Sequence, residues 1–169
     1  MPEPQFTETP RVEIVPCGPE HYEAFRRLNE AWISRYFRME PPDRRVLEAP
    51  QAEILDHGGH ILVALVEGEP AGVCALLRVD EGTFELAKMA VAEHARGLGI
   101  GSRLGETAIA TARSAGASRL ILESNTILAP AIALYRKLGF TEVTGIPSEY
   151  SRCNIHMELS LTPHGRPEL

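Results

Sequence analysis

Residues 85–102 read ELAKMAVAEHARGLGIGS, and this stretch decides the fold. Its first half continues a predicted strand over 83–92, and its three glycines, at 97, 99 and 101, open a helix predicted over 99–115. Glycine lets a backbone approach a ligand closely, and the free N–H groups and positive dipole end of a helix N-terminus favour a phosphate. The guanidinium of Arg96 can bind a second phosphate oxygen. The stretch therefore predicts a strand, loop and helix that bind a phosphate group, with a plain glycine-rich turn as the structural alternative.

The spacing of the glycines disfavours two common phosphate-binding loops. A P-loop ends in Gly-Lys-Ser or Gly-Lys-Thr, which is absent, and the dinucleotide pattern needs glycine at position 102 or 104, where Ser102 and Leu104 stand. Glu123 lies at about the distance expected of the acidic residue in a dinucleotide site, but residues 93–96 separate the strand from the first glycine. A dinucleotide oxidoreductase is therefore a distant alternative.

Outward from this loop, the chain alternates between strand and helix patterns. Three apolar segments joined by short turns predict an antiparallel meander, because parallel crossovers need longer connections. The expected strands are 11–16, 60–67, 71–80, 83–92, 119–123, 140–144 and 153–161, and the expected helices are 19–37, 41–56, 99–115 and 130–138. Gly116 and Gly139 follow the last two helices as stop signals. The order β-α-α-β-β-β-α-β-α-β-β predicts a single α+β domain over 11–161, with a mixed sheet of about seven strands flanked by about four helices.

Composition narrows the class of protein. With 169 residues, 44% of them hydrophobic, one domain with a real core is expected, and proline-rich residues 1–10 and 162–169 read as loose tails. A net charge of −6 without a run of Lys or Arg argues against a nucleic-acid partner. The longest apolar stretches, 61–66 and 71–77, are far shorter than the ~18 residues of a membrane span, and residues 1–10 lack the features of a signal peptide. No membrane partner is expected.

The cysteines and histidines indicate neither a disulfide framework nor a metal site. Cys17, Cys74 and Cys153 are widely spaced and form no Cys-x-x-Cys pair, so reduced thiols in a cytoplasm fit best. The histidines at 60, 94 and 156 have no ligand partner at metal spacing. We therefore expect a cytoplasmic protein without a metal.

Two motifs together carry a family resemblance. Arg-x-x-Gly-x-Gly follows the strand over 85–91, and residues 134–140 read LYRKLGF. The chain closely resembles the GNAT superfamily of acetyl-CoA-dependent N-acetyltransferases over roughly residues 12–161. The resemblance implies a GNAT-like fold, a strongly twisted mixed sheet splayed open in the middle to admit the pantetheine arm of acetyl-CoA. It also implies that the cofactor contacts residues of two segments: Met89, Ala90 and Val91 along the thioester arm, and Arg96, Gly97, Leu98, Gly99, Ile100, Gly101 and Ser102 around the pyrophosphate.

One position departs from the family pattern. Many members carry an asparagine seven residues before the motif tyrosine, but that position here is Leu128. Asn125 lies closer to the end of the preceding strand. Its side chain either contacts the cofactor or the acceptor, or forms an Asx turn after the strand.

Acetyl transfer to an amine sets the chemistry that the site must supply. An amine with a pKa of ~10.4 must lose a proton before it attacks, and the leaving thiolate needs an acid. The resemblance assigns the acid to Tyr135, which would lie beside the cofactor sulfur and would otherwise simply pack on its helix. It assigns the general base to Glu85, as in the histone-acetyltransferase branch, with a water chain as the alternative. Glu85 lies six residues before Val91, so the two should face the same side unless a bulge intervenes, whereas Lys88 should be a solvated charge.

The acceptor pocket is less defined by the sequence. The resemblance places the region of Trp32, Tyr36, Phe37, Arg44 and Arg45 on one side of it, and Tyr150, Arg152 and Asn154 could close the other, although packing or surface duty is the simpler reading of each. An acetyl-enzyme route would need a cysteine, and Cys74, the one candidate, suits core packing better.

Tyr135 and Glu85 favour an enzyme over a module that only binds acyl-CoA. We expect an N-acetyltransferase that moves acetyl from acetyl-CoA to a primary amine by direct attack in a ternary complex, and the alternative is a non-catalytic acyl-CoA-binding sensor module. The acceptor is a small-molecule amine or a peptide amine, between which the sequence does not choose. The oligomeric state is open, a homodimer included.

Overall fold

The computed structural model describes residues 9–162. The expected tails, 1–10 and 162–169, therefore lie almost entirely outside the described residues. None of the helices between residues 9 and 162 is long and apolar enough to cross a membrane.

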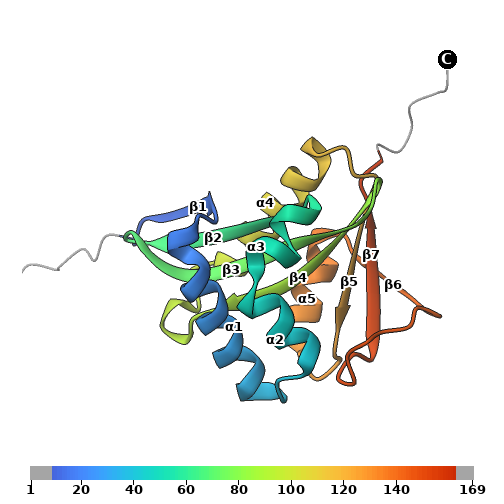
Figure 1. Cartoon of the computed structure of the whole chain (residues 1–169), viewed down its shortest axis with the longest axis horizontal. Helices are drawn as coiled ribbons and strands as arrows, with labels where there is room; N and C mark the ends of the chain where they lie inside the picture. Colours follow the sequence, from blue (N-terminus) through green and yellow to red (C-terminus); the bar gives the residue numbers. More distant parts are fainter. Residues whose placement is uncertain (1–8, 163–169) are drawn as a thin grey trace, which may run out of the picture.

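One mixed sheet forms the centre of the molecule (Figure 1). Its order is β1-β2-β3-β4-β5-β7-β6, and every neighbouring pair is antiparallel except β4 and β5. The strands are β1 (Val12–Pro16), β2 (His60–Val66), β3 (Glu69–Asp80), β4 (Thr83–Val91), β5 (Arg119–Ser124), β6 (Thr141–Val143) and β7 (Ile155–Ser160). The expected meander is β2, β3 and β4. The parallel pair follows from the connection between β4 and β5, which runs through a full helix.

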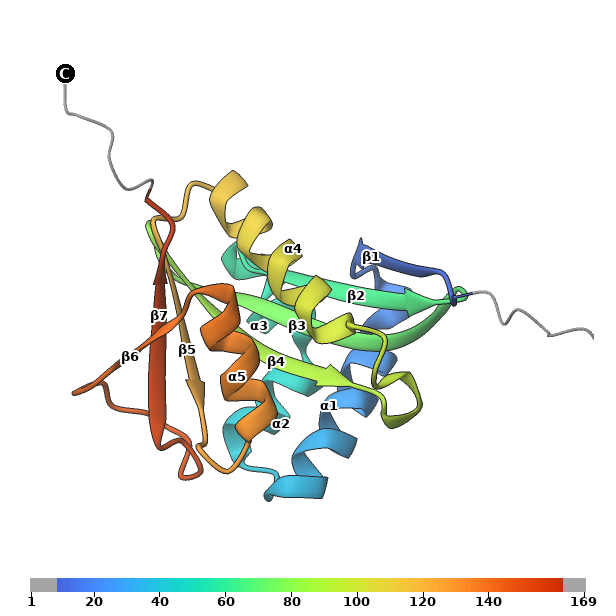
Figure 2. The same cartoon turned by 180° about the vertical axis from the view of Figure 1, so that it is seen from behind.

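Helices cover both faces of this sheet. One face carries α1 (Tyr22–Tyr36), α2 (Pro41–Glu48) and α3 (Pro50–Glu53), and the other carries α4 (Ile100–Ser114) and α5 (Ala129–Leu138) (Figures 1 and 2). Three short 3-10 turns complete the elements: η1 (Pro19–His21), η2 (Leu55–His57) and η3 (Glu93–Ala95). Each face has its own apolar cluster, one around Phe25, Ile33 and Val63 and the other around Leu76, Leu104 and Met157. The α+β class and the seven strands are confirmed.

The helix expected over 41–56 is wrong in extent. The chain leaves helical geometry at Ala49, whose ψ is 58°, and Pro50 starts a separate helix. Proline has no N–H to give to a continuing helix and disfavours helical geometry in the residue before it. The structure thus has five α-helices within residues 9–162, where about four were expected. The stop signals at Gly116 and Gly139 are confirmed, because both have the positive φ of a left-handed residue.

The sheet splits between β4 and β5. The two strands pair only at Thr83, Phe84 and Glu85, although β4 continues to Val91 and β5 to Ser124. Figure 2 shows the strands diverging from this short contact. The expected splay is therefore confirmed, and Glu85 occupies the last paired position before the gap.

A bulge in β4 exchanges the faces of the strand. Val73 of β3 pairs with Ala90, whereas Ala75, two residues later, pairs with Ala87, so β4 holds one extra residue. Lys88 lies in the bulge with a φ of 54°. Because of the bulge, Val91 packs on the cluster under α4, whereas Glu85 lies on the opposite side of the strand. Glu85 and Val91 were expected to share a side unless a bulge intervened, and this bulge puts them on opposite sides.

Candidate active site

A cleft of about 110 Å³ opens where β4 and β5 part. Its walls come from α1, from β4 around the bulge, from the end of β5, from α5 and from the segment before β7. Several residues expected around the acceptor line it: Trp32, Phe37, Tyr150 and Arg152. Tyr36, Arg44, Arg45 and Asn154, which were grouped with them, are not among the residues that line this cleft. Asn154 instead accepts a hydrogen bond from the backbone of Thr126 at 2.9 Å.

The carboxyl group of Glu85 faces this cleft from the fork of the sheet. Burial raises its pKa to about 7, and the negative charges of Glu123 and Glu149 add to the effect, while Lys88 opposes it. A carboxyl group with a pKa near 7 can take up and release a proton at neutral pH. The Glu85 side chain is largely buried, although the residue follows a turn at the start of the strand.

Tyr135 reaches the same cleft from the other face of the sheet. It lies on α5 and packs against the apolar cluster around Leu76, Leu104 and Met157, which we call the α4-side cluster. Its ring meets that of Phe140 edge-on, with 6.0 Å between the centroids. Burial, with a smaller effect of Cys74, raises its pKa to about 12, so the phenol is protonated at neutral pH and can donate a hydrogen bond. The gap in the sheet thus brings Glu85 and Tyr135 to one cavity from opposite faces. Their catalytic roles remain predictions.

Lys88 is not the solvated charge that the strand parity predicted. The bulge turns its side chain into the protein, where it is only 6% exposed, and its Nζ donates to Oδ1 of Asp43 at 2.6 Å and to the Tyr150 hydroxyl at 3.1 Å. Asp43 is fully buried and also accepts two hydrogen bonds from Arg152, at 2.6 and 2.7 Å, and one from the backbone of Glu40. We call Glu40, Asp43, Lys88, Tyr150 and Arg152 the buried ionic network.

The buried ionic network fixes one wall of the cleft. Burial by itself would raise the pKa of Asp43, but the hydrogen bonds from Arg152 and Lys88 outweigh it and lower that pKa to about 2. The cations of Lys88 and Arg152 also lie over the ring of Tyr150, at 4.7 and 4.5 Å from its centroid. The network therefore ties α2 to β4 and to the segment before β7.

The glycine loop has the geometry of a ligand-binding helix start. Gly97 and Gly99 have φ angles of 85° and 72°, and a Cβ on either would meet no atom of residues 9–162 within 4 Å, so there is open space beside both. The helix begins at Ile100, whose side chain is buried in the core, and its first N–H groups follow Gly99. Leu98 packs on the same cluster. Arg96 is exposed and donates to the Tyr36 hydroxyl at 3.0 Å, which keeps its guanidinium beside the loop. Contact of this loop with a phosphate remains a prediction.

Asn125 forms the Asx turn that was one of its two expected roles. Its Oδ1 accepts from the backbone of Ile127 at 2.9 Å, and its Nδ2 donates to the carbonyl of Arg152 at 2.7 Å. The residue also lines the cleft, where it ties the end of β5 to the segment before β7.

The structure confirms the packing role of Cys74 and brings Cys153 and His156 into the site. Cys74 is fully buried in the core with a pKa raised by burial to about 12, which confirms core packing and leaves it out of reach of an acyl group. Cys153 lines the cleft instead. The expectation that no histidine has a ligand partner is wrong, because ligand atoms of Glu123, Cys153 and His156 lie within 4.8 Å of one another.

Sequence reasoning missed Asp43 and Glu123 as functional residues. Asp43 lies in the first turn of α2, where an acidic residue is typical of a helix cap. It does act as a cap, because its carboxylate accepts a hydrogen bond from the backbone N–H of Glu40. Nothing local shows that the same carboxylate holds two cations from distant elements. Glu123 was weighed only as a dinucleotide residue.

Known proteins share this sequence pattern and this fold. The model of the Acetyltransferase (GNAT) family matches residues 23–140, more than half of the chain. The IAA acetyltransferase of Azospirillum brasilense is 45% identical over 83 residues, which are 48% of this chain and 54% of that protein. For the curated relatives that match, the shared segment is about a third to a little over half of their own length.

Solved structures agree on the fold. A GNAT-family acetyltransferase from Staphylococcus aureus MU50 superposes with a TM-score of 0.82 at 21% identity, over 90% of this chain and 100% of that chain. The yncA protein of Salmonella typhimurium, solved with its cofactor acetyl-CoA, superposes with a TM-score of 0.72 at 22% identity, over 94% of this chain and 98% of the other. Because the family model matches more than half of the chain and the solved structures share its fold, the chain belongs to the GNAT family of acetyltransferases.

Proposed function

We propose that this chain transfers the acetyl group of acetyl-CoA to a primary amine by direct attack in a ternary complex. The observation that carries the proposal is the cleft at the fork of β4 and β5, which Glu85 and Tyr135 line from opposite faces of the sheet. Acetyl-CoA supplies an activated acetyl thioester. The chain supplies a loop for the pyrophosphate, a free strand edge for the pantetheine arm, a base and a hydrogen-bond donor.

The residues expected at the cofactor fit this role. The open space around Gly97 and Gly99 and the first N–H groups of α4, from Ile100, Gly101 and Ser102, would receive the phosphates. Beyond Glu85 the edge of β4 that faces β5 pairs with no strand among the described residues, so main-chain groups near Met89 and Val91 are available to the arm.

Glu85 is the proposed general base. An acceptor ammonium must lose its proton before the nitrogen can attack, and a largely buried carboxylate with a pKa of about 7 is basic enough to take that proton and acidic enough to release it afterwards. Glu123 lines the same cleft, and its negative charge makes the Glu85 carboxylate a stronger base.

Tyr135 is the proposed donor to the leaving sulfur. When the carbon–sulfur bond breaks, the sulfur carries the electron pair away, and a protonated phenol beside it stabilises that charge by a hydrogen bond or a proton. Transfer in one complex needs no acyl-enzyme. Cys153 is the thiol that a two-step route would use, since Cys74 is out of reach.

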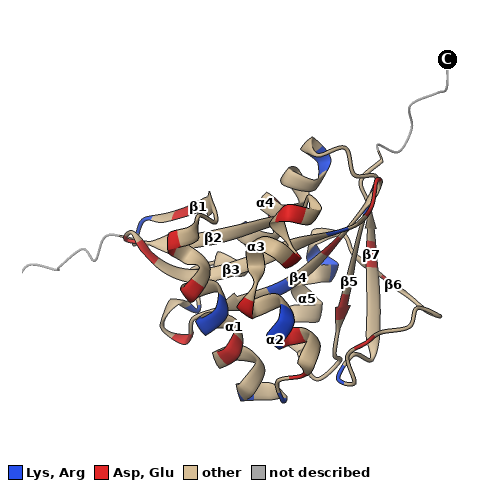
Figure 3. Cartoon of the chain, in the orientation of Figure 1, with Lys and Arg blue, Asp and Glu red and all other residues tan. Residues whose placement is uncertain are grey.

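The acceptor is proposed to be a cationic amine of a small molecule or a peptide. The carboxylates of Glu40 and Asp43 are already engaged by Lys88 and Arg152, whereas Glu85 is without a cationic ion-pair partner among the described residues. Acidic and basic residues are interspersed over the helices and strands (Figure 3), and with a net charge of −6 the chain as a whole attracts cations and repels nucleic acid. A cytoplasmic location is part of the proposal, supported by three cysteines that are all free thiols.

The activity is tested by measuring release of the coenzyme A thiol with a panel of amines, amino acids and peptides. At least one amine should be acetylated. If no member of the panel causes release of the thiol, the proposed transfer is overturned. Mass spectrometry after mixing the protein with acetyl-CoA alone tests the route, because stoichiometric acetylation of Cys153 would contradict direct attack.

The role of Glu85 is tested by pH dependence. With the best acceptor, kcat/KM should rise with pH through about 7 as Glu85 ionises. Glu85→Gln should remove that inflection and lower kcat/KM by roughly 10²- to 10⁴-fold. Glu142→Gln, on the exposed strand β6, is the control and should behave as the parent chain. If Glu85→Gln keeps both the rate and the inflection, the base is a water chain or another group.

A further inference from the structure

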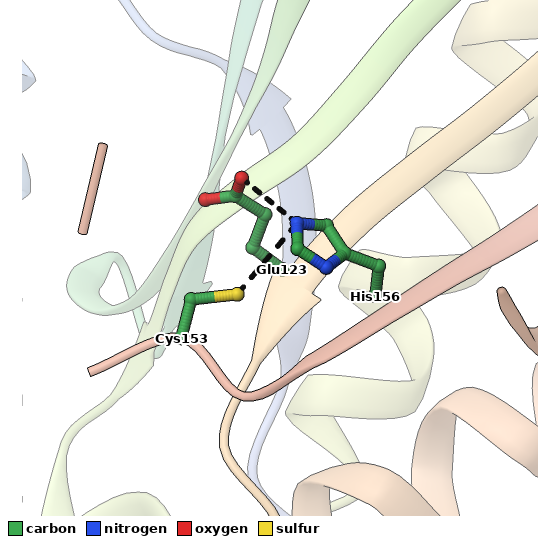
Figure 4. A group of neighbouring side chains, drawn as sticks. All are labelled: Glu123, Cys153 and His156. Atoms are coloured by element: carbon green, nitrogen blue, oxygen red, sulfur yellow. Dashed lines mark hydrogen bonds and ion pairs between the residues drawn. The ribbon is translucent and has the colours of Figure 1, made fainter. Parts of the chain in front are cut away.

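Three side chains converge on the wall of the acceptor cleft (Figure 4). Glu123 near the end of β5 is the direct cross-strand partner of His156 on β7. Their neighbours Leu122 and Met157 belong to the apolar cluster under α4, so Glu123 and His156 point to the opposite face of the sheet. Cys153 lies just before β7 begins. The three side chains are all partly buried.

The geometry of this Glu123–Cys153–His156 cluster differs from that of a proton relay. In a relay, the thiol and the carboxylate engage different nitrogens of the imidazole. Here the same nitrogen, Nε2 of His156, lies 3.2 Å from Oε1 of Glu123 and 3.8 Å from Sγ of Cys153. Three atoms of three types face one another around a common centre. This arrangement is typical of ligands that share one ion.

The separations match the edges of a tetrahedral zinc site. With Zn–S of ~2.3 Å and Zn–N and Zn–O of ~2.0–2.1 Å, sulfur and nitrogen ligands lie ~3.6 Å apart, and nitrogen and oxygen ligands ~3.3 Å apart. The observed values of 3.8 and 3.2 Å are close to both. Hard cations such as Mg²⁺ prefer oxygen ligands alone, so a thiolate and an imidazole select a softer ion.

The charge of the three ligands and a hydrogen bond to one of them also support a metal site. The negative charges of a thiolate and a carboxylate, beside a neutral imidazole, cancel the charge of one divalent cation, so the complex is neutral at this partly buried site. The hydroxyl of Ser148 donates to Oε2 of Glu123 at 2.9 Å, which orients the carboxylate and leaves Oε1 toward the centre. Such outer contacts commonly position metal ligands.

We propose that Glu123, Cys153 and His156 bind a thiophilic divalent cation of the Zn²⁺ class, with three protein ligands and a remaining position for water or acceptor. Binding releases the proton of the Cys153 thiol and forms a metal–sulfur bond, with no change of oxidation state. Because Glu123 and Cys153 also line the cleft, the ion lies in its wall and joins the end of β5 to the segment before β7. Acetyl transfer as proposed above does not require it.

Cobalt is the probe for the test, because Co²⁺ bound to a thiolate absorbs in the near ultraviolet by charge transfer. One equivalent of Co²⁺ added to the chelator-treated full chain should give this band, and Zn²⁺ should abolish it by displacement. The absence of a thiolate band in the parent protein overturns the proposal, whether or not any variant folds. The titration contains neither acetyl-CoA nor an acceptor, so its result is independent of the proposed function.

Two variants and one control assign the ligands. Cys153→Ser should remove the charge-transfer band, and His156→Gln should weaken Co²⁺ binding by roughly tenfold or more. Cys17→Ser, at a part-buried thiol outside the cluster, should leave band and affinity unchanged. Circular dichroism confirms that each variant is folded. A band that persists in Cys153→Ser, or that is lost in Cys17→Ser, contradicts the assignment.

Discussion

Replacing Asp43 by Asn should destabilise the protein by about 3 kcal/mol at pH 7. A carboxyl group whose pKa falls from 3.8 to about 2 on folding contributes about 2 kcal/mol to the free energy of unfolding at neutral pH. Breaking a buried ion pair by removing one partner costs ~3–5 kcal/mol in all. Asn leaves the buried Lys88 cation without its anion, whereas Arg152 keeps Glu40, so the expected loss lies at the lower end of that range. Urea denaturation at pH 7 measures the difference, with exposed Asp56→Asn as the control expected within ~0.5 kcal/mol of the parent.

The pH dependence of this difference is a second part of the same prediction. Because folding lowers the pKa of Asp43, its stabilisation is complete above about 4, the unfolded value, and declines as the pH falls toward about 2, the folded value. The gap between the parent and Asp43→Asn should therefore narrow between pH 4 and pH 3. A loss below 1 kcal/mol at pH 7, or a gap of the same size at pH 3, would refute the reasoning. Lys88→Met added to Asp43→Asn should recover part of the loss, since it removes one stranded cation.

Further predictions concern the site and the packing around it. Tyr135→Phe should lower kcat by roughly ten- to a thousandfold, while its affinity for acetyl-CoA, measured by titration calorimetry, stays nearly unchanged. Equal kcat in the parent protein and in Tyr135→Phe would remove Tyr135 from the mechanism. Gly99→Val should weaken acetyl-CoA binding by about 2 kcal/mol. Gly116→Val is the control, because Gly116 also has a positive φ and open space but lies at the far end of α4, and it should leave binding unchanged. Equal acetyl-CoA affinities of the two variants would place the pyrophosphate elsewhere. Gly59→Ala should lower the free energy of unfolding by ~1–3 kcal/mol in urea denaturation, because its Cβ would lie 2.5 Å from the carbonyl oxygen of Leu76, and an unchanged midpoint would show that the backbone yields there.

Local signals predicted the framework of the fold. The meander, the glycine loop and the helix ends at Gly116 and Gly139 follow from short stretches of sequence whose turns and caps act locally. The break at Pro50 also had a local signal, a proline inside a helical pattern, which the expected helix over 41–56 ignored.

The parts of the site that were missed depend on contacts between distant residues. A bulge shows no pattern of its own in the sequence, so parity along β4 placed Lys88 in solvent and Val91 on the side of Glu85. The partners of Asp43 are 45 and 109 residues away. Cys153 and His156 are three residues apart, but the third ligand of their cluster, Glu123, comes from another strand through the β5–β7 register.

On the proposed cofactor placement, the short pairing of β4 with β5 makes the stability of the folded chain depend on acetyl-CoA. Past Glu85 the facing edges of these strands pair with no strand within residues 9–162, so a row of main-chain groups is available to a ligand. On the proposed placement, the pantetheine arm is that ligand, and acetyl-CoA binds the folded chain but not the unfolded one. By mass action, acetyl-CoA at a hundred times its Kd adds ~2.7 kcal/mol to the free energy of unfolding. The folded fraction of the protein, and with it its resistance to proteolysis, then follows the supply of acetyl-CoA in the cell.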